Sequence, residues 1–347
     1  MPIVQAPMAG GLNTPDLASA VCESGGVGSF GFSYSSPETI DQTLAVTKTK
    51  TSGPLNANFF VFQPFAIPSK QEQVDAVEAL NKLSVMDGLD VVFPTEPFFP
   101  DLESQLEVIW SHRPEILSFH FGLPQPEVIE KASALGISIG ITATNLNEAL
   151  AIERSGASFI VAQGIEAGGH RGCFVDDDSD NELPLLDLLD SLVSEIKIPL
   201  VAAGGVMDGF GLADCLEMGA TAAQLGTAFL CCDEAGTGST YRKFLLKESH
   251  RSTRFTRAFS GRTARGINNL FIELMENKAT LPFPIQNTLT SMLRKVATQN
   301  DEGEYQSLWA GSEYAKIREL PVVKLIQEIE REIGQSKEKT IDPLPTR

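Results

Sequence analysis

Short apolar runs ending in small residues alternate with amphipathic segments along the 347-residue chain. Each run has about the four to eight residues typical of a buried strand. The pattern predicts eight strands, over residues 3–8, 27–32, 55–61, 116–121, 138–142, 158–163, 200–203 and 222–225.

Helices are predicted between these strands, where a capping residue with proline opens an amphipathic segment or a glycine closes it. Thr14-Pro15-Asp16 opens the first, which closes at Gly25-Gly26, and Ser36-Pro37-Glu38 opens the second. Further helices are predicted over residues 125–135, 146–155, 185–196, 210–218 and 313–333.

The repeated order of helix, glycine and apolar strand indicates βα units around a parallel sheet. Eight such units favour a closed barrel over an open, doubly wound sheet. An open dinucleotide-binding sheet would carry Gly-x-Gly-x-x-Gly after its first strand, whereas residues 6–11 read Ala-Pro-Met-Ala-Gly-Gly. We therefore predict an α/β fold, a (β/α)8 TIM barrel.

Two segments exceed what a barrel needs, because such a fold takes about 250 residues. Residues 63–113 are rich in Phe and Pro and have no assigned role, and residues 231–308 are polar and helix-like. We expect residues 1–230 and 309–347 to form the barrel. Residues 231–308 would form a small inserted helical domain over the barrel mouth, where it would exclude water.

Composition and charge narrow the class of protein. A hydrophobic content of 42% and a mean hydropathy of −0.01 indicate a soluble globular chain. No apolar run approaches the roughly 18 residues that span a membrane, and the N-terminus shows no secretory signal. The net charge of −18 argues against nucleic acid or an anionic membrane as partner.

Five cysteines show no metal-ligand spacing and four histidines are scattered, so no metal site is expected. Free thiols suit a reducing cytoplasm, which is the predicted location. A monomer or a homodimer is expected.

The most informative segment is residues 162–172, which read Ala-Gln-Gly-Ile-Glu-Ala-Gly-Gly-His-Arg-Gly. This loop follows a predicted strand, and loops at the carboxyl ends of barrel strands carry the chemistry of such enzymes. Its glycines let the backbone approach a ligand while the ring of His170 points at it. His170 is therefore the candidate catalytic residue.

A phosphate site is predicted after the seventh and eighth strands. Gly204-Gly205 follows one and Gln224-Leu225-Gly226-Thr227 ends the other, so backbone N–H groups and a hydroxyl can converge on phosphate oxygens. At other strand ends, the amides of Asn58 and Gln163 suit a planar heterocycle. Ala6-Pro7-Met8 would bring backbone against that ring.

The cofactor that fits these features is flavin mononucleotide (FMN). A nicotinamide dinucleotide would want an acidic residue about 20 positions after a glycine-rich turn, and none is found there.

Taken together, these motifs closely resemble those of nitronate monooxygenases, once called 2-nitropropane dioxygenases. The resemblance covers essentially the whole chain and rests on residues 5–11, 58–60, 120–122, 163–172, 203–205, 224–227 and 260–266. It implies a catalytic His170 and FMN contacts. The predicted cofactor-binding residues are Ala6, Pro7, Met8, Asn58, Gln163, Gly168, Gly169, Gly204, Gly205, Gln224, Leu225, Gly226 and Thr227.

The resemblance implies that O2 and FMN oxidise alkyl nitronates to a carbonyl compound and nitrite, with neutral nitroalkanes an open question. His170 would act as a base on the carbon acid or as a cation holding the anionic substrate. Because FMN-dependent enoyl-acyl-carrier-protein reductases share residues 166–170, reduction of an enoyl thioester by NAD(P)H is the alternative. A flavin-binding module without turnover is a third reading, and a nucleotide dehydrogenase with Cys173 as nucleophile is a fourth.

Other titratable residues have two readings each. His120 either faces the mouth or packs in the core, and Glu166 orients the loop in preference to acting in catalysis. Arg171 either holds an anion or, more commonly for such a residue, forms a surface ion pair. Arg262 and Arg265 either reach the mouth or brace the inserted segment.

Overall fold

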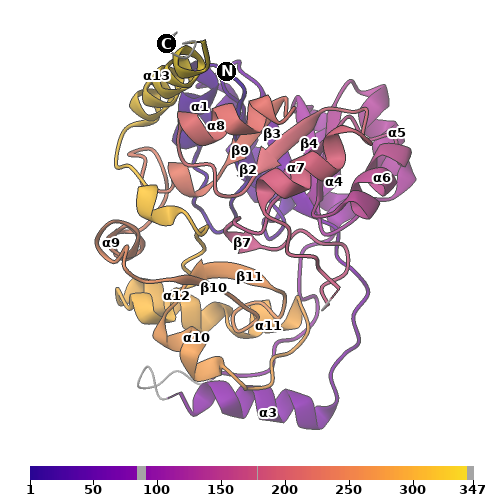
Figure 1. Ribbon diagram of the computed structural model, residues 1–347. Helices are drawn as coiled ribbons and strands as arrows, with labels where there is room; N and C mark the ends of the chain where they lie inside the picture. Colours follow the sequence, from indigo (N-terminus) through magenta and orange to yellow (C-terminus); the bar gives the residue numbers. More distant parts are fainter. Residues whose placement is uncertain (84–90, 178, 342–347) are drawn as a thin grey trace.

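The computed structural model describes residues 1–83, 91–177 and 179–341. Eight strands form one parallel sheet in the order β1-β9-β8-β6-β5-β4-β3-β2. A parallel bridge between Val4 and Val27 joins the two ends of that order. The sheet therefore closes on itself with helices outside it, which confirms the (β/α)8 barrel (Figure 1).

Every predicted strand is present, although most ends shift. The barrel strands are β1 (Ile3–Gln5), β2 (Gly28–Gly31), β3 (Leu55–Phe60), β4 (Ile116–His120), β5 (Ser138–Ala143), β6 (Phe159–Gln163), β8 (Leu200–Ala203) and β9 (Ala222–Leu225). The prediction over 200–203 and 222–225 is confirmed. The first strand is shorter than predicted, because Pro7 has no N–H to donate and Asn13 bonds the backbone of Ala6 and Met8 instead.

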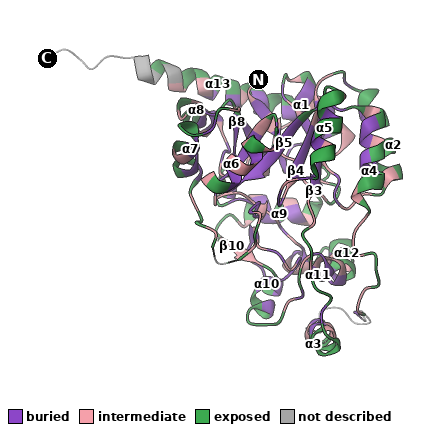
Figure 2. Cartoon of the chain, turned by 90° about the vertical axis from the view of Figure 1, so that its right-hand side faces the viewer, coloured by how far each residue is buried: buried purple, intermediate pink, exposed green. Residues whose placement is uncertain are grey.

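Helices cover the outside of the barrel, and Figure 2 shows their buried faces turned inward. They are α1 (Pro15–Glu23), α2 (Pro37–Lys48), α4 (Leu102–His112), α5 (Pro126–Ala134), α6 (Leu146–Arg154), α7 (Leu185–Val193), α8 (Gly209–Glu217) and α13 (Val322–Ile341). Thr14 and Ser36 cap the first two as their sequences predict.

The last helix begins later than the prediction over 313–333. Residues before it form a single 3₁₀ turn, η3 (Tyr314–Lys316), and α13 starts at Val322. Pro321 is the physical reason, because a proline disfavours helical backbone at the residue before it.

A second, smaller lobe lies beside the mouth of the barrel (Figure 1). It contains α9 (Ser239–Lys247), β10 (Thr253–Thr256), β11 (Ala264–Ile267), α10 (Leu270–Met275), α11 (Ile285–Leu289), α12 (Ser291–Gln299) and η2 (Gly303–Tyr305). It is not helical alone, because β10 and β11 pair with β7 (Gly169–His170) in an antiparallel sheet. The division of the chain at residues 230/231 and 308/309 stays a prediction.

The segment 63–113 divides between the two bodies. Its last part, α4, packs against α2 and the barrel core through Leu106 and Ile109. Its middle part, α3 (Lys70–Asn81), instead joins the lobe, because Ala76 and Leu80 belong to one buried cluster with lobe residues such as Phe259. The segment thus connects the barrel with the far side of the lobe (Figure 1).

None of the described helices is long and apolar enough to cross a membrane.

Candidate active site

A cavity of about 560 Å³ lies at the carboxyl ends of the barrel strands and is bounded on its other side by lobe residues such as Asn287, Arg294 and Trp309. This volume is within the range of small-molecule sites. The cavity is lined by most of the predicted residues, namely Ala6, Pro7, Met8, Asn58, Gln163, Gly168, Gly169, His170, Gly204, Gly205, Gln224, Gly226 and Thr227.

Leu225 is the predicted site residue that does not line the cavity. Its side chain belongs to the barrel core, and its carbonyl accepts a hydrogen bond of 2.7 Å from the N–H of Ala6. Alternate residues of a strand face opposite sides, so Leu225 turns away where Gln224 turns inward. Its contribution is to hold Ala6 against β9.

His170 is held at the cavity wall by Ser260, a lobe residue of the 260–266 motif for which the sequence indicated no contact with His170. Its Nε2 lies 2.9 Å from Oγ of Ser260, whose hydroxyl donates to the carbonyl of Arg262 at 3.0 Å. We assign the ring proton to Nε2 of His170, because the Ser260 hydroxyl directed at the carbonyl of Arg262 leaves its oxygen to accept from the ring. The lone pair of the neutral ring is therefore on Nδ1.

Aromatic side chains surround the His170 ring. The ring centroids of Phe60, Phe121, Phe283 and Trp309 lie 5.8, 5.6, 5.7 and 5.8 Å from it. Two of these residues lie more than 100 positions further along the chain, and no spacing in the sequence indicates that they meet His170.

This enclosure keeps the His170 ring neutral. Burial in the apolar surroundings, followed by the nearby His120 and the charges of Arg262 and Arg294, lowers the pKa of His170 from 6.5 to about 3. The ring is therefore uncharged at neutral pH.

His120 and Gln163 fix the backbone beside the catalytic candidate. Nε2 of His120 donates to the carbonyl of His170 at 3.2 Å, and Nδ1 accepts from the hydroxyl of Thr142 at 2.9 Å. The amide of Gln163 donates to the same carbonyl at 3.1 Å and accepts from the N–H of Gly172 at 2.7 Å. Both side chains line the cavity, yet their polar groups hold the loop.

Glycines after β8 and β9 leave backbone donors available at one end of the cavity. Gly204 and Gly205 have φ angles of +110° and +72°, which side-chain-bearing residues rarely adopt. A Cβ on Gly204 would come within 3.0 Å of the N atom of Ala167. Within the described residues, the N–H groups of Gly204, Gly205 and Gly226 donate no hydrogen bond to the protein.

Thr227, at the start of η1 (Thr227–Phe229), joins this end of the cavity to the returning chain. Its Oγ1 accepts a hydrogen bond of 3.0 Å from the N–H of Gly311. The hydroxyl proton remains available to a ligand.

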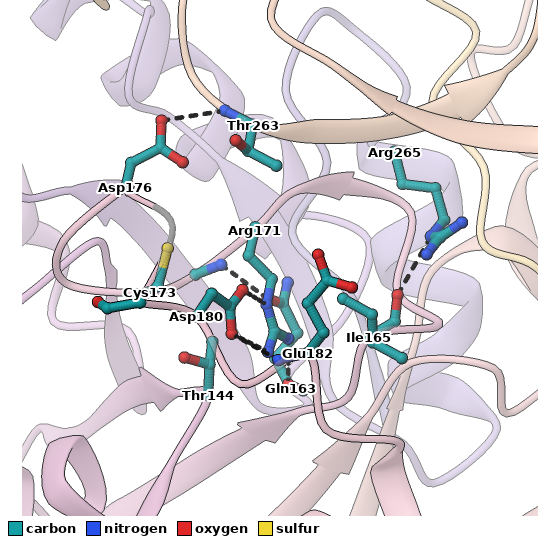
Figure 3. A network of polar contacts seen from close by, with 12 residues as sticks. Thr144, Gln163, Ile165, Arg171, Cys173, Asp176, Asp180, Glu182, Thr263 and Arg265 are labelled. Atoms are coloured by element: carbon teal, nitrogen blue, oxygen red, sulfur yellow. Dashed lines mark hydrogen bonds and ion pairs between the residues drawn. The ribbon is translucent and has the colours of Figure 1, made fainter.

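Arg171 lies beneath the loop, neither on the surface nor in the cavity (Figure 3). Its side chain is 2% exposed and makes two hydrogen bonds to Asp180, of 2.6 and 3.0 Å. It also donates to the carbonyl of Gln163 at 2.6 Å. The expectation of a surface ion pair is therefore wrong, because the loop encloses the pair as it folds back over β6.

The remaining charged residues of this region have bracing roles. Arg265 donates to the carbonyl of Ile165 at 3.1 Å (Figure 3). Arg262 donates to the carbonyl of Cys173 and stacks 3.9 Å over the ring of Phe121. The carboxylate of Glu166 accepts from the N–H of Leu185, which orients the loop as expected.

Cys173 is not placed to act as a nucleophile. Its side chain is buried, and burial raises the pKa of its thiol to about 11. A thiol with that pKa is protonated at neutral pH and is a poor nucleophile. Among the described residues, no group of three His, Cys, Asp or Glu side chains could hold a metal ion.

Comparisons with known proteins agree with one another. A family model described as nitronate monooxygenase matches residues 1–332. A nitronate monooxygenase of Paraburkholderia phytofirmans is 40% identical, covering 97% of this chain and 93% of that protein. One from Pseudomonas aeruginosa is 35% identical and covers 96% of each.

Solved structures extend the likeness to the whole architecture. The nitroalkane oxidase of Streptomyces ansochromogenes superposes with a TM-score of 0.92 at 36% identity, over 98% of this chain and 97% of that one. FabK of Thermotoga maritima superposes with a TM-score of 0.75 at 26% identity, over 98% and 94%.

Proposed function

The chain belongs to the nitronate monooxygenase family and is an oxidoreductase, and from this premise we propose that it oxidises alkyl nitronates with O2 on a bound FMN. The products would be a carbonyl compound and nitrite. The observation that carries the proposal is the placement of His170, which lines the cavity and whose Nδ1 has no hydrogen-bond partner among the described residues.

The cavity fits FMN at the end where the unbonded amides lie. The N–H groups of Gly204, Gly205 and Gly226, with the hydroxyl of Thr227, offer donors for a phosphate. Positive φ at the first two keeps this corner free of side chains. A Cβ on Gly226 would lie 3.3 Å from Cβ of Ala6, so the turn after β9 packs closely against residues 6–8.

The rest of the flavin would lie along the cavity. Residues 6–8 would present backbone to the ring, and the side chains of Asn58 and Gln224 would offer amide donors and acceptors at its edge. Gly168 and Gly169 would line it from the loop after β6. Bound there, FMN would accept electrons from the substrate and return them to O2.

His170 would serve as the base when a neutral nitroalkane enters. Nδ1 would take a proton from the carbon beside the nitro group, while Ser260 holds the ring in that tautomer. The aromatic rings around His170 would limit the access of water to the reacting carbon. With a preformed nitronate no proton need be taken, and His170 would orient the substrate.

The experiment that tests this proposal begins with the absorption spectrum of the purified protein, before and after reconstitution with FMN. Oxygen uptake and nitrite release are then measured with a small alkyl nitronate. A protein that binds no FMN would overturn the proposal.

His170→Asn should bind FMN yet lose about 10²- to 10⁴-fold in turnover of a nitroalkane, the range for one acid–base residue. Full turnover in that variant would refute the role given to His170.

A second candidate function is reduction of an enoyl thioester by NAD(P)H. The likeness to FabK of Thermotoga maritima favours it, although the likeness to the Streptomyces nitroalkane oxidase is greater in both identity and TM-score. Rapid anaerobic bleaching of the flavin by NADH or NADPH would support the reductase. Slow bleaching by both, with fast bleaching by a nitronate, would support the oxidase chemistry.

Partners and location stay predictions. The partners proposed are the small-molecule nitronate and O2, in a monomer or homodimer of the cytoplasm.

A further inference from the structure

A second polar group faces the cavity and has no part in the flavin site described above. Arg294 of α12 lines the cavity together with Tyr34, which follows β2. Nη2 of Arg294 donates to the carbonyl and the side-chain oxygen of Asn287, at 2.7 and 3.0 Å. Its Nε is shielded from solvent and has no hydrogen-bond partner.

No carboxylate forms an ion pair with Arg294 among the described residues. The buried Arg171, in contrast, has a counter-ion, because Asp180 pairs with it at 2.6 Å. A guanidinium stays protonated in proteins, and enclosing its charge without a counter-ion is unfavourable. Arg294 therefore presents an unbalanced positive charge to the cavity, which is what an anionic ligand would neutralise.

Tyr34 supplies a second donor that lines the same cavity and lies near enough to Arg294 to feel its charge. Its hydroxyl is also shielded from solvent and without a hydrogen-bond partner. Burial raises the pKa of this hydroxyl, while the neighbouring charge of Arg294 lowers it to a smaller extent, so the group stays protonated. The ring packs edge-on against Phe60 with 5.6 Å between centroids, which fixes the direction of the hydroxyl.

We propose that Arg294 and Tyr34 form the oxyanion site of the substrate pocket and hold the two oxygens of a planar, singly charged O–N–O group. The inference rests on the proposed function, where the nitronate substrate and the nitrite product both have this shape. It divides the work of the site: the arginine supplies the positive charge, and His170 acts on the carbon as a neutral ring.

The charge distribution around His170 supports this division. The positive charge of Arg294 is one of the causes that lower the pKa of His170, so the two groups are electrostatically coupled and would not both be cations. An imidazolium at position 170 is thus unnecessary for holding an anion. The sequence left two roles open for His170, a base on the carbon acid or a cation that holds the anionic substrate. His170 would then keep the first role, and Arg294 would take the second.

The test measures binding of nitrate, a planar oxyanion, to the holoenzyme. Trp309 lines the cavity, so its fluorescence reports occupancy without turnover. Arg294→Gln should weaken nitrate binding about 10- to 100-fold, and Tyr34→Phe about 10-fold, as expected for hydrogen bonds to a charged group. Lys295→Gln is the matched control, because it removes the same charge from the exposed neighbouring residue and should leave the affinity unchanged.

Steady-state kinetics show whether the anion that Arg294 binds is the nitronate substrate or another anion. Arg294→Gln should raise the KM of a nitronate at least 10-fold and that of the parent nitroalkane much less, whereas Arg294→Lys should recover part of the loss. Unchanged nitrate affinity in Arg294→Gln would overturn the inference. If that variant fails to fold, the same measurements on Arg294→Lys and Tyr34→Phe decide, and wild-type affinity in both would overturn it.

Failure of the proposed function gives a different result. A wild-type enzyme that binds nitrate through Arg294 but oxidises no nitronate would retain the oxyanion site and lose the proposed reaction.

Discussion

At the residue scale, the hydrogen bond from His170 to Ser260 determines which atom of the ring can accept a proton. The hydroxyl of Ser260 donates to the carbonyl of Arg262, so its oxygen accepts from Nε2 and leaves Nδ1 free. His120 has no such freedom, because both of its nitrogens are engaged. One histidine of this pair is therefore available to a substrate, and the other holds it in place.

The pH profile should show no titration of His170 in the physiological range. Its pKa is lowered to about 3 by burial and by neighbouring positive charge, so the ring is already neutral at every pH above about 4. Flavin reduction by a nitroalkane, followed by anaerobic stopped flow, should keep a constant limiting rate from pH 8 to pH 5. An inflection near 6.5 that disappears in His170→Asn would show instead that the ring titrates normally.

Removal of the Ser260 hydroxyl should impair catalysis without removing the base. In Ser260→Ala, Nε2 of His170 loses its acceptor, and an unsatisfied buried donor costs about 1–3 kcal/mol. The ring would rotate or change tautomer, and we expect the limiting rate of flavin reduction to fall about 10-fold with FMN affinity retained. Ser260→Thr keeps the hydroxyl and should recover most of the rate; equal loss in both variants would indicate a packing defect.

At the element scale, the loop after β6 is fixed from two sides. Above it, β7 pairs with β11 of the lobe, placing His170 opposite Ala264. Beneath it, Arg171 links Asp180 to the carbonyl of Gln163 (Figure 3). A glycine-rich segment that would otherwise be mobile is thus held rigidly enough to position a catalytic ring.

Asp180→Asn should destabilise the protein strongly, because it leaves Arg171 buried without its counter-charge. Breaking such a pair costs about 3–5 kcal/mol of unfolding free energy, measurable by urea denaturation at pH 7. Asp177→Asn, at an exposed aspartate of the same loop, should leave the midpoint unchanged.

The pH dependence of that loss follows from the Asp180 carboxyl. Burial raises its pKa, the hydrogen bond and charge of Arg171 lower it, and the net shift is downward. A depressed pKa stabilises the fold above the ordinary value near 4 and ceases to do so as pH falls through the folded value. The difference between wild type and Asp180→Asn should narrow below pH 4, and a constant difference would exclude the ionised pair as its cause.

Local signals in the sequence located the elements that build the flavin end of the site. Strand runs such as residues 200–203 end in the Gly204-Gly205 turn, and both follow from short-range patterns. Strand periodicity also argues against Leu225 as a side-chain contact of the cofactor, since Gln224 and Leu225 must face opposite sides of the strand. The substrate end could not be read in this way. Ser260 and Arg294 reach the cavity through pairings of distant segments, and no period in the sequence encodes those contacts.

At the scale of the whole molecule, the described residues form a large barrel core and smaller separate clusters, and the cavity lies between the barrel strands and the lobe. The barrel core contains the strands and outer helices, whereas a separate cluster joins α3 to α10, α11 and α12. Stacked rings of Phe62, Phe99 and Phe283 connect the segment before α4 with the aromatic rings around His170. The substrate end of the site therefore depends on a core that the barrel strands do not share.

Leu80→Ala should loosen the lobe and leave the barrel intact. Leu80 is 3% exposed in a cluster that also contains Leu293, the neighbour of Arg294 on α12. Truncating a buried leucine costs about 2–5 kcal/mol, and here the loss falls on a cluster that is separate from the barrel core. Hydrogen exchange should quicken across residues 259–293 and stay unchanged in β3 and β8, while FMN remains bound and the KM of the nitronate rises. Val74→Ala is the control, because Val74 is 49% exposed on the same helix. This variant should change neither the hydrogen exchange of the lobe nor the KM of the nitronate. Equal acceleration of exchange in the barrel strands would show that the two cores unfold as one unit.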